Sequence, residues 1–131
     1  MKRSYLNLPA DCRGVSEILA RVGDRWTVLT IMYLGDGPKR FSELRRLIGG
    51  ISQKMLTVTL RGLERNGFVT RTVFPTIPPQ VEYELTDLGR DLLVPVRALG
   101  DWARLNQARV ERAHQRYDDH AAATLPLRRA G

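Results

Sequence analysis

The apolar positions recur every three or four residues up to about residue 66, and this period predicts amphipathic helices. A first helix is expected over residues 13–22 and a second over residues 26–34. Nearly every position of the second segment is apolar, so we expect it at the centre of a core. A short third helix is predicted at residues 43–48, capped by Ser42. A fourth follows, and the first half of the chain therefore indicates a mainly α-helical domain.

The fourth helix, from Ser52 to Asn66, has the clearest polarity. Gly49 and Gly50 form the turn before it, and the Ser52 hydroxyl can cap its first free amide groups. Its inward face is predicted to carry leucines at steps of four and three residues: Leu56, Leu60 and Leu63. Its outward face carries an amide, a hydroxyl and cations without a carboxylate: Gln53, Lys54, Thr57, Arg61 and Arg65. Such groups pair with base edges and phosphates.

After Gly67 the pattern takes the period of strands. Residues 68–74 are rich in β-branched and aromatic side chains, and residues 81–85 alternate apolar with acidic positions. The proline-rich residues 75–79 cannot extend a sheet interior. Two strands joined by a projecting loop, directly behind a helix-turn-helix, predict a wing. The expected fold is therefore mainly α with a small antiparallel β-wing, a winged helix-turn-helix over residues 12–93.

A further helical pattern begins at Thr86 and carries an apolar stripe over residues 94–117. A winged domain of this size has little left to cover that stripe. We interpret it as a dimerisation helix with these interface residues: Val96, Leu99, Trp102, Ala103, Asn106 and Val110. Packing of the stripe on the chain's own first helix is the alternative. Residues 1–11 are expected to form a flexible arm and residues 118–131 a disordered tail.

The charge of the chain indicates an anionic partner. Its 131 residues carry a formal net charge of +7. Between Asp36 and Phe74 there are eight lysines or arginines but only three acidic residues, so most of the excess surrounds the fourth helix. This concentration favours nucleic acid over an acidic membrane surface. No apolar run approaches the roughly 20 residues needed to cross a bilayer, so no membrane partner is expected.

The sequence contains few groups arranged for catalysis. His114 and His120 lie six residues apart in a polar region and, with Cys12 far away, do not have the spacing of a recognised metal site. No nucleophile motif and no phosphate-binding glycine loop occurs. We therefore expect a non-enzyme without catalytic residues, metal or cofactor. A single cysteine and no apolar leader segment favour a reducing cytoplasmic setting.

Several separated motifs occur in one order: Cys12 and residues 22–27 (VGDRWT), 40–44 (RFSEL), 51–57 (ISQKMLT), 60–64 (LRGLE), 78–86 (PPQVEYELT) and 99–102 (LGDW). Together they make the chain resemble the HxlR family of bacterial winged-helix transcription regulators, relatives of the MarR group. The resemblance spans roughly residues 12–102. It implies a homodimer whose terminal helices form the interface and whose recognition helices enter successive major grooves of a pseudo-palindromic operator.

Three positions depart from the family pattern. Arg13 stands where the family usually has proline, and Gly62 stands where its recognition helix often has a carboxylate. Gln80 follows the proline pair, where a basic residue is common in the family. Arg71 is then the one formal cation near the wing, so the wing is expected to add less phosphate affinity than usual.

The expected DNA contacts follow from the phase of the fourth helix and its flanks. Phosphate contacts are predicted for cationic side chains: Arg40, Arg45, Lys54, Arg61 and Arg71. The amides at the Ser52 helix start also favour an anion. Base reading is assigned to Gln53, Thr57 and Arg61, because arginine pairs with both acceptors of guanine and glutamine pairs with adenine.

The sequence leaves the regulatory signal open. Some relatives sense oxidants or electrophiles through a cysteine in the position of Cys12, and Arg13 places a cation beside it in sequence. The alternative is that Cys12 is a small buried apolar residue that packs the first helix. A small-molecule effector held between the dimer helices and the core is a third alternative.

Two other binding functions compete with regulation through DNA. A winged helix used only for protein contacts predicts an apolar or acidic outer face on the fourth helix, whereas the residues there are basic. RNA binding is disfavoured because the wing and that helix lack exposed aromatics on which bases could stack.

Overall fold

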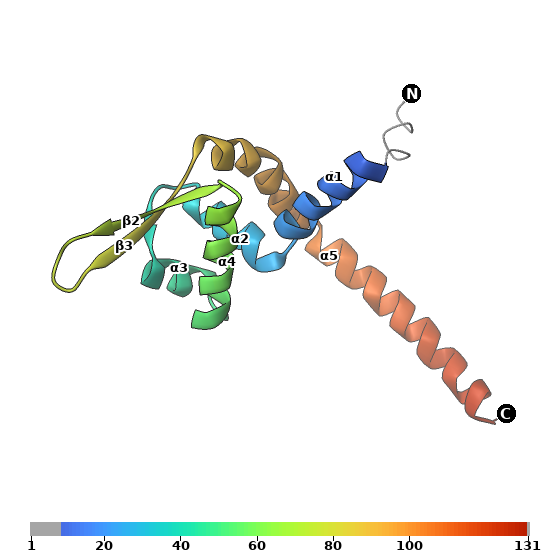
Figure 1. Cartoon of the computed structure of the whole chain (residues 1–131). Coiled ribbons are helices and arrows are strands. Elements are labelled where there is room, and N and C mark those ends of the chain that lie inside the picture. The colour runs from blue at the N-terminus through green and yellow to red at the C-terminus, as the bar shows by residue number, and fades with distance from the viewer. Residues whose placement is uncertain (1–8, 131) are drawn as a thin grey trace. The chain divides into compact units, whose positions relative to one another are not determined.

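The computed structural model of the chain describes the backbone of residues 9–130 and the side chains of residues 13–124 (Figure 1). Its elements are α1 (Pro9–Val22), α2 (Arg25–Leu34), β1 (Lys39–Arg40), α3 (Phe41–Ile48), α4 (Gln53–Arg65), β2 (Val69–Phe74), β3 (Gln80–Leu85) and α5 (Asp87–Ala130). This order confirms the predicted fold class, a mainly α-helical winged helix-turn-helix with a small antiparallel sheet. The chain divides into two compact units, residues 1–97 and residues 98–131.

The sheet has the strand order β1-β3-β2 and is antiparallel throughout. β2 and β3 pair in register from Val69 opposite Leu85 to Phe74 opposite Gln80. Residues 75–79 therefore form the tip of a hairpin, and we call residues 69–85 the wing. Figure 1 shows this hairpin projecting away from the helices of the first unit. The short β1 pairs Lys39 with Tyr83 and ties the segment before α3 to the base of the wing.

The core of the first unit lies where α2, α3, α4 and the sheet meet. Its most deeply buried apolar side chains come from the three helices: Ile31, Leu34, Leu44, Leu56 and Leu60. The strand side is closed by Phe68, Val69, Tyr83 and Leu85. α2 is central, as predicted, and Trp26 packs against this cluster. The buried Thr30 hydroxyl donates to the Trp26 carbonyl at 2.7 Å, so it is satisfied within the helix.

The start of α3 differs from the prediction that Ser42 caps it. The helix begins at Phe41, with Arg40 in the cap position. The Glu43 carboxylate accepts a hydrogen bond from the Arg40 amide at 2.9 Å. This contact runs from the third helical residue back to the cap residue and is one half of a capping box, with Arg40 in the place where serine or threonine usually stands.

Both ends of the described chain are more helical than predicted. α1 begins at Pro9, so residues 9–11 are not part of an arm, and residues 1–8 lie outside the described part. α5 runs through Pro95 to Ala130, so the prediction of a disordered tail from residue 118 is wrong for residues 118–130. A polar composition does not prevent a helix: three consecutive alanines at 121–123 have high helix propensity. Gln115 also donates to Asp119 one turn later, at 3.0 Å.

The start of α5 depends on close contact with the residues that follow α4. The Thr86 hydroxyl donates to the Gly67 carbonyl at 2.6 Å and accepts from the Gly89 amide at 3.0 Å, so Thr86 caps the start of α5. A Cβ atom on Gly89 would collide with the Phe68 backbone carbonyl. Glycine is therefore required where α5 crosses the chain between α4 and the wing.

We expect Gly89→Ala to lower the free energy of unfolding by about 1–3 kcal/mol, because the methyl group overpacks a backbone contact that cannot move aside. Urea denaturation followed by circular dichroism measures this change. Gly14→Ala is the matched control: its Cβ meets nothing within 4 Å, so the same substitution in α1 should stabilise by up to about 1 kcal/mol. Equal effects of the two substitutions would contradict the close approach at Gly89.

Candidate nucleic-acid interface

The turn between α3 and α4 fixes where the exposed face of α4 points. Gly49 and Gly50 have φ angles of 68° and 71°, a left-handed conformation that glycine adopts without strain. Ile51, 4% exposed, then anchors the turn in the core. The Ser52 hydroxyl accepts a hydrogen bond from the Met55 amide at 3.0 Å, so the predicted cap of α4 is confirmed.

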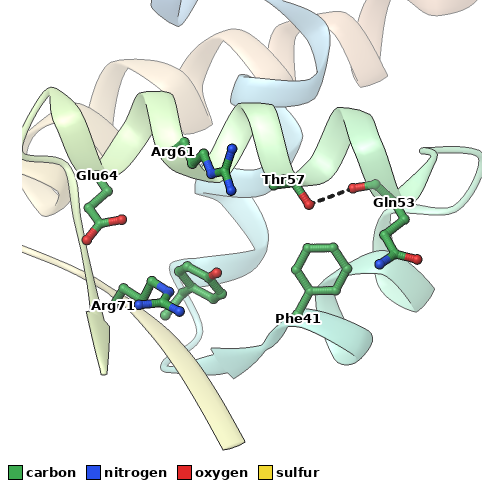
Figure 2. Close-up of a pocket in the computed structure, with 7 residues that line it drawn as sticks. Phe41, Gln53, Thr57, Arg61, Glu64 and Arg71 are labelled. Atoms are coloured by element: carbon green, nitrogen blue, oxygen red, sulfur yellow. Dashed lines mark hydrogen bonds between the residues drawn. The ribbon is translucent and has the colours of Figure 1, made fainter. Parts of the chain in front are cut away.

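The two faces of α4 separate as the sequence predicts. The inward face is buried and consists of Leu56, Thr59, Leu60 and Leu63. Four of the five predicted outward residues are exposed: Gln53, Lys54, Arg61 and Arg65. The fifth, Thr57, is half-buried, and its hydroxyl donates to the Gln53 carbonyl at 2.8 Å (Figure 2). Since its proton is used inside the helix, Thr57 offers an outside partner an acceptor oxygen and a methyl group.

A hollow of about 510 Å³ lies between α4, the start of α3 and the base of the wing. It is lined by Phe41, Gln53, Thr57, Arg61, Glu64, Arg71 and Tyr83, and Figure 2 shows these side chains around it. The guanidinium groups of Arg61 from α4 and Arg71 from β2 line the same hollow. The structure thus joins four predicted site residues, the base-reading set and the wing cation, on one surface.

Three residues of the hollow were missed by the sequence prediction: Phe41, Glu64 and Tyr83. Neither Phe41 nor Tyr83 was assigned to the site from the sequence; Tyr83 lines the hollow beside Arg71, its partner across the sheet. Glu64 places a carboxylate in a hollow whose helix face was expected to have none. Helical spacing could have found it, since it follows Arg61 by three residues and Thr57 by seven.

The other predicted phosphate contacts lie outside the hollow but on the same helix-turn-helix. Arg40 is exposed at the start of α3, and Lys54 is exposed in the first turn of α4. Arg45 is exposed, and its Nε donates to the Ile51 carbonyl at 3.4 Å, across the turn. The first turn of α4 holds no acidic residue, so nothing offsets the positive end of its helix dipole near Lys54.

The structure corrects one residue of the predicted dimer interface. Val96 is 5% exposed and packs in the core of the first unit, so it is not free to contact a second copy. The apolar pattern of α5 runs unbroken from its core-facing part into its second part, which is why the sequence did not separate the two. Within the second unit Leu99 and Trp102 are each 56% exposed, and Ala103 and Val110 are exposed.

Asn106, the remaining residue of that predicted interface, lies half-buried among the exposed apolar positions of α5. Its side-chain amide donates to the Trp102 carbonyl at 2.8 Å, and its carbonyl oxygen accepts from Arg109 at 2.9 Å. Trp102, Asn106 and Val110 also line a shallow hollow of about 430 Å³. α1, in the first unit, carries its own exposed apolar stripe: Val15, Ile18 and Leu19.

Neither a metal site nor a membrane span is found in the described part of the chain. Its histidine, cysteine, aspartate and glutamate residues form no group of three that could hold a metal ion. None of its helices is both long and apolar enough to cross a bilayer. Cys12 lies in the first turn of α1, but its side chain is outside the described residues.

Comparison with known proteins identifies relatives over most of the chain. A family model described as HxlR-like helix-turn-helix matches residues 21–111. YtfH of Escherichia coli K12, an uncharacterized HTH-type transcriptional regulator, is 48% identical over 100 residues, 76% of this chain and 79% of that protein.

Two solved structures resemble the chain at comparable identity. YtfH from Salmonella typhimurium, described as a transcriptional regulator, has a TM-score of 0.74 at 46% identity and covers 77% of this chain and 90% of that one. The redox regulator HypR in its oxidized form has a TM-score of 0.67 at 41% identity, over 71% and 96% of the two chains. The chain thus belongs to the HxlR-like helix-turn-helix family of transcriptional regulators.

Proposed function

We propose that the chain binds double-stranded DNA sequence-specifically, as a homodimer on a pseudo-palindromic operator. The observation that carries the proposal is the hollow beside α4, where Gln53, Thr57 and Arg61 share one open surface with Arg71 of the wing. An amide, an acceptor oxygen and two guanidinium groups are the combination that recognises base edges and phosphates together. α4 is the recognition helix in this proposal.

Affinity would come from phosphates on both sides of the groove that α4 enters. Arg40, at the cap of α3, and Arg45, on α3, supply cations at one side, and Arg71 supplies one at the other. The capped amino end of α4 adds its free amides and its dipole, reinforced by Lys54. Neutralising several phosphates releases counterions, so the affinity should depend steeply on salt.

Specificity would come from side chains along the outward face of α4. Arg61 can donate to both major-groove acceptors of guanine, and Gln53 can pair with adenine. Thr57 contributes an acceptor oxygen and a methyl group, which suit an exocyclic amino group or a thymine methyl. Glu64 lines the same hollow. Its carboxylate would repel phosphate and can accept a hydrogen bond from the amino group of cytosine, so it limits where the DNA backbone can lie near the hollow.

The exposed stripe of α5 supports pairing with a second copy. Leu99, Trp102, Ala103 and Val110 leave apolar surface in water, and an isologous contact between two α5 helices would bury it. Two copies related by a two-fold axis present two α4 helices. A two-fold operator has matching half-sites.

A winged helix used only for protein contacts is the competing function. It requires an apolar or acidic outer face on α4, whereas Lys54, Arg61 and Arg65 are exposed there. If the chain acted only through protein contacts, its binding to a partner would not depend on duplex DNA.

Thiol chemistry at Cys12 is a second candidate property, and the observation that favours it is the likeness to the redox regulator HypR. With one cysteine in each chain, oxidation would join the two Cys12 residues of a dimer or add a small thiol to each. For a small-molecule effector, the described part of the first unit offers a hollow of about 1080 Å³ beside α1, bordered by Ile18, Phe68 and Leu92.

Selection of bound fragments from random duplex DNA is expected to return a two-fold repeat. Its half-sites should lie about one helical turn apart, on the order of 34 Å, or a multiple of it. If each subunit neutralises about four phosphates, log affinity should fall with log salt at a slope of roughly −7 per dimer. A slope near zero on the selected duplex, or a footprint over one unrepeated half-site, would contradict the proposal.

Arg61→Ala is expected to cost about 1–3 kcal/mol of binding free energy and to relax sequence preference, because a bidentate base contact is lost. Fluorescence anisotropy on the selected duplex and on single-base variants measures both effects. Arg90→Ala is the matched control: it removes the same charge from α5 in the first unit, where the guanidinium lies 3.7 Å from Asp87. Equal losses for the two variants would remove Arg61 from the reading surface.

Treatment with diamide is expected to change the DNA affinity of the parent protein and to leave that of Cys12→Ser unchanged. The thiol is the group that the oxidant attacks, so the serine variant isolates its contribution. The same anisotropy titration before and after treatment provides the measurement. Identical responses of the two proteins would make Cys12 a packing residue.

A further inference from the structure

The tip of the wing exposes an apolar surface that the proposed phosphate and base contacts do not use. Ile77 is fully exposed, and Val73 and Phe74 at the end of β2 are 49% and 40% exposed. From Thr72 to Val81 the sequence contains no charged residue. Val73 and Phe74 are consecutive in β2 and so point to opposite faces of the hairpin, with Ile77 in the loop between the strands, so the end of the wing is apolar on both faces.

The loop is folded so that it presents this surface outward. The Thr76 amide donates to the Phe74 carbonyl at 2.8 Å, and the Thr76 hydroxyl donates to the Pro78 carbonyl at 2.7 Å. These bonds satisfy polar groups of the turn internally, while the flanking prolines restrict its backbone. The tip is thus a preorganised apolar knob, with Ile77 at its most exposed position.

The length of the hairpin matches the distance between neighbouring DNA grooves. Arg71 lines the hollow beside α4, and Phe74 lies three residues further along β2, about 10 Å away at the rise of a strand. The loop to Ile77 adds several ångströms. Adjacent major and minor grooves are separated by half a helical turn, about 17 Å. With α4 in the major groove, the tip therefore reaches the adjacent minor groove.

We propose that Ile77 and its apolar neighbours enter that minor groove as a wedge, so that the dimer reads the bendability of the DNA beside each half-site. This inference rests on the proposed DNA-binding function. A cation at the tip would gain from the strong negative potential of a narrow, stiff A-tract groove. An uncharged apolar tip gains from contact with sugars and base faces, which requires the groove to widen and the duplex to bend.

The wedge makes the base steps under the tip part of the recognition sequence. Pyrimidine–purine steps such as TA and CA open and kink most easily, whereas A-tracts resist bending. Operators should therefore carry a flexible step beneath each wing, at positions that α4 does not touch. Replacing that step by an A-tract should weaken binding although every contact of α4 is kept.

The test uses the full-length protein and the duplex selected from random DNA, labelled at its two ends with a fluorescence donor and acceptor. Ile77→Ala should reduce the protein-induced bend and weaken binding about tenfold, since an apolar contact is lost. Ile77→Arg should instead steepen the salt slope by about 2 per dimer, because two further phosphates are neutralised. Val94→Ala, an exposed apolar position on α5, is the control and should leave bend and affinity unchanged.

The outcomes separate the wedge from the proposed function. Loss of bending in Ile77→Ala together with a steeper slope in Ile77→Arg supports the wedge. Parent-like bending and affinity in Ile77→Ala, with an unchanged slope in Ile77→Arg, overturns it and leaves DNA binding by α4 intact; the tip is then a surface for a protein partner. A parent protein that selects no duplex overturns both. Ile77 is fully exposed, so neither variant should change the urea midpoint.

Discussion

Burial of one face of α4 is the constraint on which the candidate recognition surface depends. Leu56, Leu60 and Leu63 are almost wholly inaccessible, and turning any of them outward would cost roughly 1.5–3 kcal/mol of transfer free energy. Burial of these leucines fixes the rotation of α4 about its own axis, and this rotation fixes the directions of its other side chains. The glycine turn and the Ser52 cap fix where the helix begins and so fix which residues occupy each face. Packing energy thereby sets the geometry of a polar surface that itself contributes little to stability.

The wing is positioned by the same core through a different contact. Val69, Tyr83 and Leu85 are buried, so the base of the hairpin belongs to the core while the strands beyond it leave it. Pairing of Arg71 with Tyr83 then brings the one wing cation to the rim of the α4 hollow. Further along β2 every side chain is exposed, and the hairpin has no packing of its own to satisfy. Its outer half is therefore held by strand pairing and by the hydrogen bonds of its loop instead of by the core.

Most of the fold could be predicted from the sequence because the hydrophobic periodicity agreed with the positions of the turn and cap residues. Leucine spacing, the glycine pair and the serine cap each indicated the same α4, and alternation with a proline loop indicated the wing. The failures have local causes. Val96 and the predicted interface residues after it follow one helical period, and only the three-dimensional core shows where burial ends. Glu64 was overlooked because it was counted only among the acidic residues of the segment, without regard to its angular position around α4. Residues 118–130 contain few large apolar side chains, although alanine and one-turn hydrogen bonds are enough for a helix.

The distribution of charge divides the surface into two kinds of contact with different physics. Cations are frequent in the helix-turn-helix, and Arg71 is the last one along the wing, so the proposed attraction to phosphate, which falls with salt, would act through α3, α4 and the base of the wing. Beyond Arg71 any gain must come from apolar contact and shape, which salt does not screen. If the proposed wedge operates, high ionic strength would weaken the long-range attraction while the discrimination between flexible and stiff duplexes would remain. The absence of a positive charge at position 80, where Gln80 stands, is consistent with the proposed apolar contact of the wing tip. A cation there would favour the narrow minor groove of a stiff A-tract, whereas the apolar tip favours a groove that widens.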